Sequence, residues 1–263
     1  MQQIPVYSFT GFLDSGKTKF IQETLEDERF NAGERTLLLI FEEGEEEYNS
    51  EKFAFGGVYP AVLEDKSELT RANLEMLAKK SDCGRVVIEY NGMWPLQALY
   101  ENMPANWAIF QEMMFAEART FIDYNRNMRS LMVDKLMNCE MVVLTRTPDD
   151  IDKEEIHKII RGISRRAAIS YDYPDGHVEY DEIEDPLPYD LEADVVNIED
   201  NDYAVFYRDL SEEMKKYDGK TVKFKGIVAR DLKLGKEALI IGRHVMTCCA
   251  DDIAYSGLVC KFK

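Results

Sequence analysis

The sequence has no apolar run long enough to cross a lipid bilayer, and its first residues lack the basic start and apolar stretch of a secretory signal. We therefore expect a cytoplasmic protein. Positive charge is also scarce, since 32 Lys and Arg stand against 50 Asp and Glu, for a net charge of -18. This balance argues against a nucleic-acid partner, because neutralising a phosphate backbone needs a basic surface.

Cysteine is scarce as well, with five residues that are odd in number and unevenly placed. This usage argues against a disulfide framework. A content of 45% hydrophobic residues is enough for an ordinary core, and 263 residues suit one large domain or two unequal ones.

Apolar strand-like runs alternate with helical patterns through the first two thirds of the chain, as in doubly wound α/β sheets. Residues 93–137 read as helical segments rich in Met and aromatic side chains. The sequence therefore predicts a doubly wound, mostly parallel α/β sheet over residues 1–171. The expected strands are 4–9, 35–41, 85–90, 140–145 and 167–171, and the other expected helices are 19–25, 67–80 and 152–165.

The composition then changes. No Lys or Arg occurs between Arg166 and Arg208, while Asp, Glu and Pro are frequent, so residues 172–201 are predicted to be an acidic linker. Short alternating runs separated by glycine follow. They predict a small β-rich domain over residues 202–263, of the kind seen in OB-like barrels.

The stretch from Gly11 to Thr18 is the most informative feature of the sequence. It reads Gly-Phe-Leu-Asp-Ser-Gly-Lys-Thr, with two glycines separated by four residues and followed by Lys and a hydroxyl residue, which fits a phosphate-binding loop (P-loop) and predicts a P-loop nucleotide-binding domain over residues 1–171. A predicted strand precedes it and a predicted helix follows it, as that loop requires. The alternative is an accidental glycine-rich turn. With strand, loop and helix in this order, the sequence favours binding of a nucleoside triphosphate.

The loop assigns roles to particular side chains. Lys17 would reach the β- and γ-phosphates and act in catalysis, and the Thr18 hydroxyl would ligate Mg²⁺. Glu89 ends a predicted parallel strand, where ligands bind in open α/β sheets, so it would hold Mg²⁺ or position water; the alternative is a strand-end Glu facing solvent. The nucleotide-binding candidates in and beside the loop are Gly11, Asp14, Ser15, Gly16, Lys17, Thr18 and Lys19.

Five carboxylates surround Gly44 in the segment 42–47, directly after the second predicted strand. Because these carboxylates repel one another, we expect the segment to be mobile unless a cation binds to it. As a switch loop it would supply Glu42 or Glu45 to Mg²⁺ or to a transported metal. The sequence is equally consistent with a solvated acidic turn that has no functional role.

These motifs resemble the CobW/HypB/UreG group of metallochaperone-type GTPases, and CobW-like proteins in particular. Gly11 to Thr18 looks like the CobW loop, Glu42-x-Gly-Glu is similar to its switch, and Glu89-Tyr-Asn-Gly followed by Pro95 is similar to its Glu-Thr-Ser-Gly motif. The resemblance covers roughly residues 4–171. It implies GTP binding with Mg²⁺ and slow hydrolysis coupled to metal delivery or cofactor insertion, and it adds Asn91 and Gly92 to the nucleotide-binding candidates.

The sequence departs from this family at two places. The family's Cys-x-Cys-Cys motif is missing, since residues 52–80 contain no cysteine. The family reads guanine with an Asn-Lys-x-Asp loop, which corresponds to the stretch that begins at Thr145. Arg146 would stack on the base in place of the family's Lys. Asp149 lies one position after the place of the family's Asp. Guanine specificity is therefore open, and ATP remains an alternative to GTP.

A second cluster lies near the C-terminus, where His244, Cys248, Cys249 and Cys260 would suit Zn²⁺. The alternative is buried cysteines in a small β core. The stretch around this cluster also resembles the C-terminal domain of a bacterial family associated with a predicted permease, over about residues 212–263. This resemblance implies a transport context.

The leading hypothesis is a Mg²⁺-dependent GTPase or NTPase that acts as a switch and whose client is a metalloprotein or a permease. One alternative is a non-catalytic nucleotide sensor that regulates a permease, and another is a zinc carrier that uses the C-terminal cluster. A homodimer is a further expectation, with Met113, Met114 and Phe115 covering a nucleotide-dependent dimer face.

Overall fold

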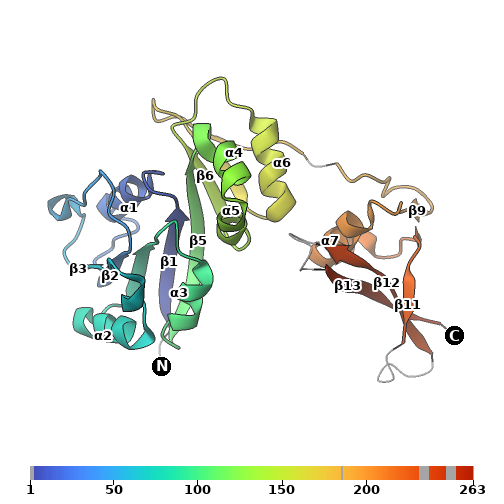
Figure 1. The fold of residues 1–263 in the computed structure, drawn as a ribbon, viewed down its shortest axis with the longest axis horizontal. Helices are drawn as coiled ribbons and strands as arrows, with labels where there is room; N and C mark the ends of the chain where they lie inside the picture. The colour runs from blue at the N-terminus through green and yellow to red at the C-terminus, as the bar shows by residue number, and fades with distance from the viewer. Residues whose placement is uncertain (1–2, 185, 231–236, 247–252, 263) are drawn as a thin grey trace. The chain divides into compact units, whose positions relative to one another are not determined.

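The computed structural model describes residues 3–184, 186–230, 237–246 and 253–262, and its chain divides into two compact units (Figure 1). The first unit comprises Met1–Ile183 and the second Glu184–Lys263. Among the described residues, no helix combines the length and apolar character that a membrane span needs.

The first unit is built on one eight-stranded sheet with the order β3-β2-β4-β1-β5-β6-β7-β8. All neighbouring pairs are parallel except β7 and β8, which confirms the predicted α/β fold with a mostly parallel sheet. The strands are β1 (Ile4–Gly11), β2 (Thr36–Ile40), β3 (Val58–Val62), β4 (Arg85–Glu89), β5 (Trp107–Glu117), β6 (Met141–Thr145), β7 (Ala168–Asp172) and β8 (Val178–Tyr180).

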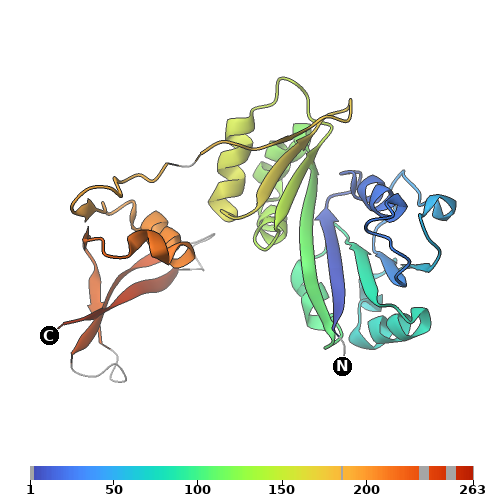
Figure 2. The same cartoon turned by 180° about the vertical axis from the view of Figure 1, so that it is seen from behind.

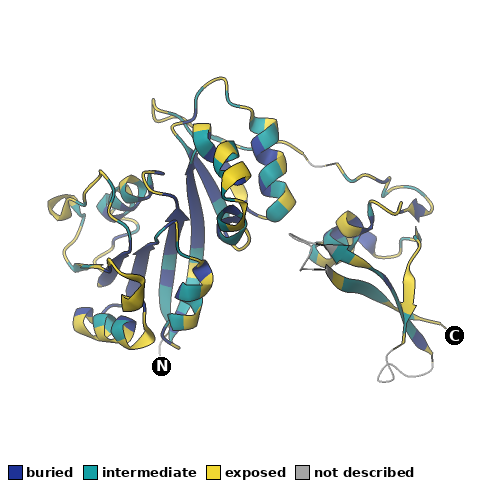
Figure 3. Cartoon of the chain, viewed as in Figure 1, coloured by how far each residue is buried: buried dark blue, intermediate teal, exposed yellow. Residues whose placement is uncertain are grey.

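Helices cover both faces of this sheet (Figure 2). Successive side chains of a strand point to opposite faces, and in the central strands the side chains on both faces are buried. Helix α1 packs on one face, and α2 to α6 pack on the other. The central strands are largely buried, the edge strands β3 and β8 are half-buried or exposed, and the outer surfaces of the helices are exposed (Figure 3). The helices are α1 (Lys17–Glu26), α2 (Arg71–Ser81), α3 (Leu96–Asn102), α4 (Ala118–Asn127), α5 (Arg129–Leu136) and α6 (Lys153–Ile163), with short 3-10 turns at Ser50–Lys52 and Lys66–Glu68.

Strand β5 corrects the sequence prediction most clearly. Residues 107–117 form an eleven-residue strand paired with both β1 and β6, not a helical segment. Met113, Met114 and Phe115 lie in this strand and are at most 4% exposed. The prediction that these three residues cover a dimer face is therefore wrong, because they pack inside the unit's own core.

The second unit is small and contains a three-stranded antiparallel sheet in the order β11-β12-β13. A two-stranded parallel ladder and one helix accompany it, around a core that includes Tyr203, Phe206 and Tyr217. In the parts of the chain that are described, this sheet does not close into a barrel. Its elements are β9 (Val196–Asn197), α7 (Tyr203–Glu212), a 3-10 turn (Met214–Tyr217), β10 (Val222–Lys223), β11 (Ile227–Ala229), β12 (Ala238–Met246) and β13 (Ile253–Lys261).

Part of the predicted acidic linker is regular structure. Strand β8 extends the large sheet by pairing with β7, and β9 pairs with β10 in the second unit. The division between the two units falls at Ile183 and Glu184, inside the segment 172–201.

Candidate functional site

The loop between β1 and α1 has the backbone that a phosphate-binding loop needs. Gly11 has φ 135°, and a Cβ there would lie 2.1 Å from the Phe115 carbonyl oxygen. Gly16 has φ 94° and directly precedes α1. Side chains at these two positions would strain or clash, so the glycines allow the tight turn from strand to helix. Asp14 also adopts a left-handed conformation, with φ 56°.

The N-terminus of α1 fits an anionic ligand. No side chain caps it, and its first turn contains no acidic residue. The first N–H groups of a helix have no partner within the helix and carry partial positive charge, which attracts phosphate oxygens. The buried Ser15 hydroxyl beside them has no hydrogen-bond partner among the described residues. The donor set and the glycine backbone therefore fit a nucleotide phosphate chain.

Lys17 lies under the loop with its side chain only 2% exposed. Its ammonium donates to the carbonyl oxygens of Gly11 at 2.9 Å and Phe12 at 2.8 Å. It also forms an ion pair of 3.2 Å with Glu42. A buried ammonium needs such partners. These contacts keep its positive charge at the loop.

Thr18 and Glu89 form the centre of the candidate metal site. The Thr18 hydroxyl donates to Glu89 Oε1 at 2.7 Å, and the Tyr48 hydroxyl donates to Glu89 Oε2 at 2.5 Å. Burial raises the pKa of the Glu89 carboxyl, while the hydrogen bonds from Tyr48 and Thr18 oppose the rise. Mg²⁺ prefers oxygen ligands and usually takes one or two carboxylates with water and substrate phosphates. The hydroxyl of Thr18 and the carboxylate of Glu89 fit that chemistry.

The loop after β4 approaches the phosphate loop closely at Gly92. A Cβ on Gly92 would lie 2.5 Å from the Gly11 carbonyl oxygen and 2.6 Å from the Phe12 Cα. Only glycine fits there, and its N–H points to Glu42 Oε2 at 3.1 Å. Asn91 holds this loop, donating to the Phe41 carbonyl oxygen at 3.2 Å. The predicted role of Asn91 in nucleotide binding stays a prediction.

The acidic segment 42–47 contacts the phosphate loop at two points. Glu42 contacts Lys17, and the Glu45 N–H lies 3.4 Å from the Asp14 carboxylate. Within the described part of the chain, no three His, Cys, Asp or Glu side chains are placed to hold a metal ion together. A metal at this segment would therefore need oxygens from a ligand or from water.

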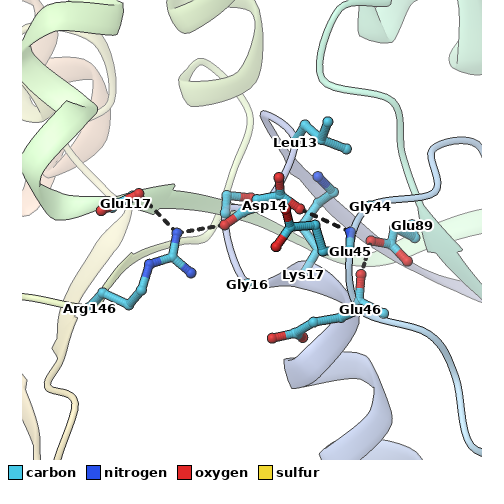
Figure 4. A pocket seen from close by; sticks show the side chains of 12 residues that line it. Leu13, Asp14, Gly16, Lys17, Gly44, Glu45, Glu46, Glu89, Glu117 and Arg146 are labelled. Carbon is cyan, nitrogen blue, oxygen red and sulfur yellow. Dashed lines mark hydrogen bonds and ion pairs between the residues drawn. The ribbon is translucent and has the colours of Figure 1, made fainter.

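The loop after β6 is fixed to the phosphate loop. The Thr145 hydroxyl donates to the Ser15 carbonyl oxygen at 2.9 Å. Arg146, with φ 50°, donates to the Asp14 carbonyl oxygen at 2.6 Å and to Glu117 Oε2 at 3.0 Å (Figure 4). The structure thus brings Thr145 and Arg146 to the predicted site.

A cavity of about 310 Å³ lies where these elements meet. Figure 4 shows Arg146 and Glu117 at one end and Glu89 at the other, with the phosphate loop between them. Asp149 and Lys19, two predicted nucleotide-binding residues, do not line this cavity and are exposed. The lining residues are Leu13, Asp14, Ser15, Gly16, Lys17, Thr18, Gly44, Glu45, Glu46, Glu89, Glu117 and Arg146.

Sequence reasoning missed several residues of this site, among them Glu117 and Tyr48, whose side chains bond other site residues. Glu117 ends β5 at the same edge of the sheet as Glu89, and the strand-end argument that found Glu89 would have found it had 107–117 been recognised as a strand. Tyr48 carried no signal in the sequence, since its role depends on a contact with Glu89 across 41 residues.

The predicted zinc site in the second unit is not assembled by the residues that are described. His244 pairs with Tyr255 across the β12–β13 hairpin, while Cys260 pairs with Leu239. Leu239 and His244 are an odd number of residues apart, so His244 and Cys260 point to opposite faces of the sheet. One ion therefore cannot bind both side chains. Cys248 and Cys249 lie outside the described residues.

Comparison with known structures finds likeness in fold to Zn(II)-bound YjiA GTPase from E. coli, at 21% identity, 64% coverage of this chain and a TM-score of 0.47. A Zn(II)-bound triple mutant of YjiA gives 20% identity and a TM-score of 0.48 over 65% of this chain. The hydrogenase maturation factor HypB from Archaeoglobus fulgidus gives 16% identity and a TM-score of 0.45, with 64% of this chain and 80% of HypB covered. The matched regions span 57% and 58% of the two YjiA chains.

Comparison with curated proteins finds no match to the sequence. Residues 177–263 match the family described as the DUF1980 C-terminal domain. The second unit, Glu184–Lys263, lies within the stretch that matches this family model.

Proposed function

We propose that the first unit binds a nucleoside triphosphate with Mg²⁺ and hydrolyses it slowly, as a switch in metal or cofactor handling. One observation carries the proposal: the Gly11–Thr18 loop surrounds the uncapped N-terminus of α1, with the Lys17 ammonium beneath it and Thr18 hydrogen-bonded to Glu89. These are the donors and the metal-ligand pair that a phosphate chain with Mg²⁺ requires.

Each residue then has a role in the proposed reaction. Lys17 and the loop N–H groups stabilise negative charge on the phosphate oxygens. The Thr18 hydroxyl and the Glu89 carboxylate hold Mg²⁺, which neutralises phosphate charge when bound. Glu89 is also buried and in contact with Thr18, where its carboxylate could orient an attacking water molecule.

For the base, we propose GTP with weak discrimination against ATP. Guanine selectivity in the resembled family depends on an Asp that accepts hydrogen bonds from the base, and Asp149 is exposed and absent from the cavity lining. Arg146, by contrast, lines the cavity and spans Asp14 and Glu117, where it could stack on either purine.

Calorimetric titration with non-hydrolysable GTP and ATP analogues, each with and without Mg²⁺, tests this assignment. We expect Mg²⁺-dependent micromolar binding of both analogues, tighter for guanine by less than about tenfold. A phosphate-release assay on the same protein tests turnover. Binding of neither analogue would contradict the proposal, and exclusive binding of the adenine analogue would contradict the assignment to GTP.

A second candidate is a nucleotide sensor without turnover that regulates a permease. The contact of Tyr48 with Glu89 favours it, because each carboxylate oxygen already accepts one hydrogen bond in the structure, which leaves fewer acceptor sites for an attacking water molecule. Tight analogue binding with negligible phosphate release would support this candidate. Steady release that depends on Glu89 would exclude it.

A further inference from the structure

The Glu42 carboxylate accepts hydrogen bonds from two donors of the candidate phosphate site, the Lys17 ammonium and the Gly92 N–H. A single oxygen, Oε2, lies 3.2 Å from the Lys17 ammonium and accepts a hydrogen bond of 3.1 Å from the Gly92 N–H. The side chains of Lys17 and Glu42 are only 2% and 11% exposed. An anionic oxygen that receives one ammonium and one backbone N–H has the same surroundings as an oxygen of a bound phosphate.

A terminal phosphate would need these donors for itself. In phosphate-binding loops the lysine reaches the β- and γ-phosphates, and Lys17 occupies that position in this chain. A γ-phosphate and the Glu42 carboxylate are both anionic, so they repel each other at close range and compete for the same ammonium. A nucleoside triphosphate can therefore bind fully only after Glu42 has moved. A diphosphate has no γ-phosphate, so only its β-phosphate shares the Lys17 ammonium, and it can bind with Glu42 still present.

Glu42 also begins the acidic segment, which contacts the site again where the Glu45 N–H lies 3.4 Å from the Asp14 carboxylate. Tyr48 directly follows this segment, and its hydroxyl contacts Glu89. Displacing Glu42 would therefore change the position of a segment that is joined directly to a residue in contact with the candidate Mg²⁺ ligand.

We propose that Glu42 is a specificity-determining residue that stands in for the terminal phosphate and sets the preference between nucleoside diphosphate and triphosphate. This inference rests on the proposed nucleotide binding and deepens it. The carboxylate weakens triphosphate binding more than diphosphate binding, because only the triphosphate has to displace it.

Two variants of Glu42 test the inference by calorimetric titration with GDP and a non-hydrolysable GTP analogue. Glu42→Gln removes the charge and keeps the shape. Glu42→Asp keeps the charge, but its shorter side chain cannot reach both Lys17 and Gly92. We expect each variant to shift the affinity ratio toward the triphosphate, by about tenfold for Glu42→Gln and less for Glu42→Asp. The titrations are run with Mg²⁺ and with EDTA, and thermal unfolding checks that each variant is folded.

Glu43→Gln is the matched control. It removes the same charge from the same segment, and Glu43 makes no hydrogen bond or ion pair with another described residue. We expect the affinity ratio of this control to stay close to that of the unsubstituted protein. An equal shift in Glu43→Gln and Glu42→Gln would overturn the inference, because a general charge effect would then explain both.

Two other outcomes also contradict the inference. An unchanged ratio in both Glu42 variants, with normal binding of both nucleotides, would overturn it alone and leave the proposed function standing. Weaker triphosphate binding in Glu42→Gln only when Mg²⁺ is present would make Glu42 a metal ligand instead of a competitor. Failure of the unsubstituted protein to bind either nucleotide would overturn the proposed function, and the inference with it.

Discussion

The Thr18 hydroxyl donates a hydrogen bond of 2.7 Å to the Glu89 carboxylate, joining two residues that are 71 positions apart in the sequence. Thr18 lies in the first turn of α1, and Glu89 ends β4, the strand that pairs with β1. The parallel register places Glu89 opposite Phe9, just before the phosphate loop begins. The sheet topology therefore brings a hydroxyl and a buried carboxylate together before any metal ion is bound.

Replacing Glu89 by Gln should remove the effect of Mg²⁺ on nucleotide affinity. The amide is neutral and a poor metal ligand, so we expect Mg²⁺ affinity in the nucleotide complex to fall by about 10- to 100-fold. Titration of the complex with Mg²⁺ measures this loss. Glu117→Gln is the matched control, since Glu117 lines the same cavity but bonds Arg146. An equal loss in both variants would contradict the assigned role of Glu89.

The Mg²⁺ effect should also depend on pH. Burial raises the pKa of Glu89 above the ordinary value, and only the ionised carboxylate holds Mg²⁺, so the effect should decline as pH falls through that raised pKa. The hydrogen bond from Tyr48 lowers this pKa. We therefore expect Tyr48→Phe to move the midpoint to higher pH, as measured by Mg²⁺-dependent nucleotide affinity across the pH range. A midpoint that stays in place or moves to lower pH would refute this account.

The loop and its flanking elements could be predicted from the sequence because their signals are local. The glycine spacing, the preceding strand and the following helix all lie within Ile4–Glu26, and the structure has them as expected. Glu89 followed from the rule that ligands bind at the carboxyl ends of parallel strands. In each case the residue type and its position along one element were sufficient.

Strand β5 and the contacts between segments could not be predicted in this way. Residues 107–117 contain Met, Ala and Glu, which favour helices, and the segment is a strand because it fills the space between β1 and β6. The ion pair of Lys17 with Glu42 depends on how a loop after one strand lies over a loop after another. No local pattern encodes such a contact.

Gly92→Ala should disrupt the site through its backbone. The added Cβ would lie 2.5 Å from the Gly11 carbonyl oxygen, so one of the two loops has to move. We expect nucleotide binding to be lost and stability to fall by about 1–3 kcal/mol, since overpacking forces backbone shifts. Titration and thermal unfolding measure the two effects.

Gly162→Ala in α6 is the control for that variant, because a Cβ there meets nothing within 4 Å. It should stabilise the protein by about 0.5–1 kcal/mol and leave nucleotide binding unchanged. If Gly92→Ala bound nucleotide as well as Gly162→Ala does, the close approach of the two loops would have no functional role.

In the second unit, Cys260→Ser should leave the zinc affinity of the 263-residue chain unchanged. Cys260 and His244 lie on opposite faces of the β12–β13 hairpin, so they cannot share one ion. Competition titration against a chromogenic zinc chelator measures the affinity. A loss in Cys260→Ser as large as the loss in His244→Ala would show that the two side chains act together, against the observed register.

Calorimetric titration of the 263-residue chain and its Lys17→Ala variant with a non-hydrolysable GTP analogue and Mg²⁺ tests the central claim most directly. Lys17 is the only charged side chain among the described residues that bonds the loop's Gly11 and Phe12 carbonyl oxygens, and it faces the phosphate site. We predict micromolar binding by the unsubstituted protein and no measurable binding by the variant, whose thermal unfolding should remain cooperative. Equal affinity in the two folded proteins would show that the loop does not bind the phosphates.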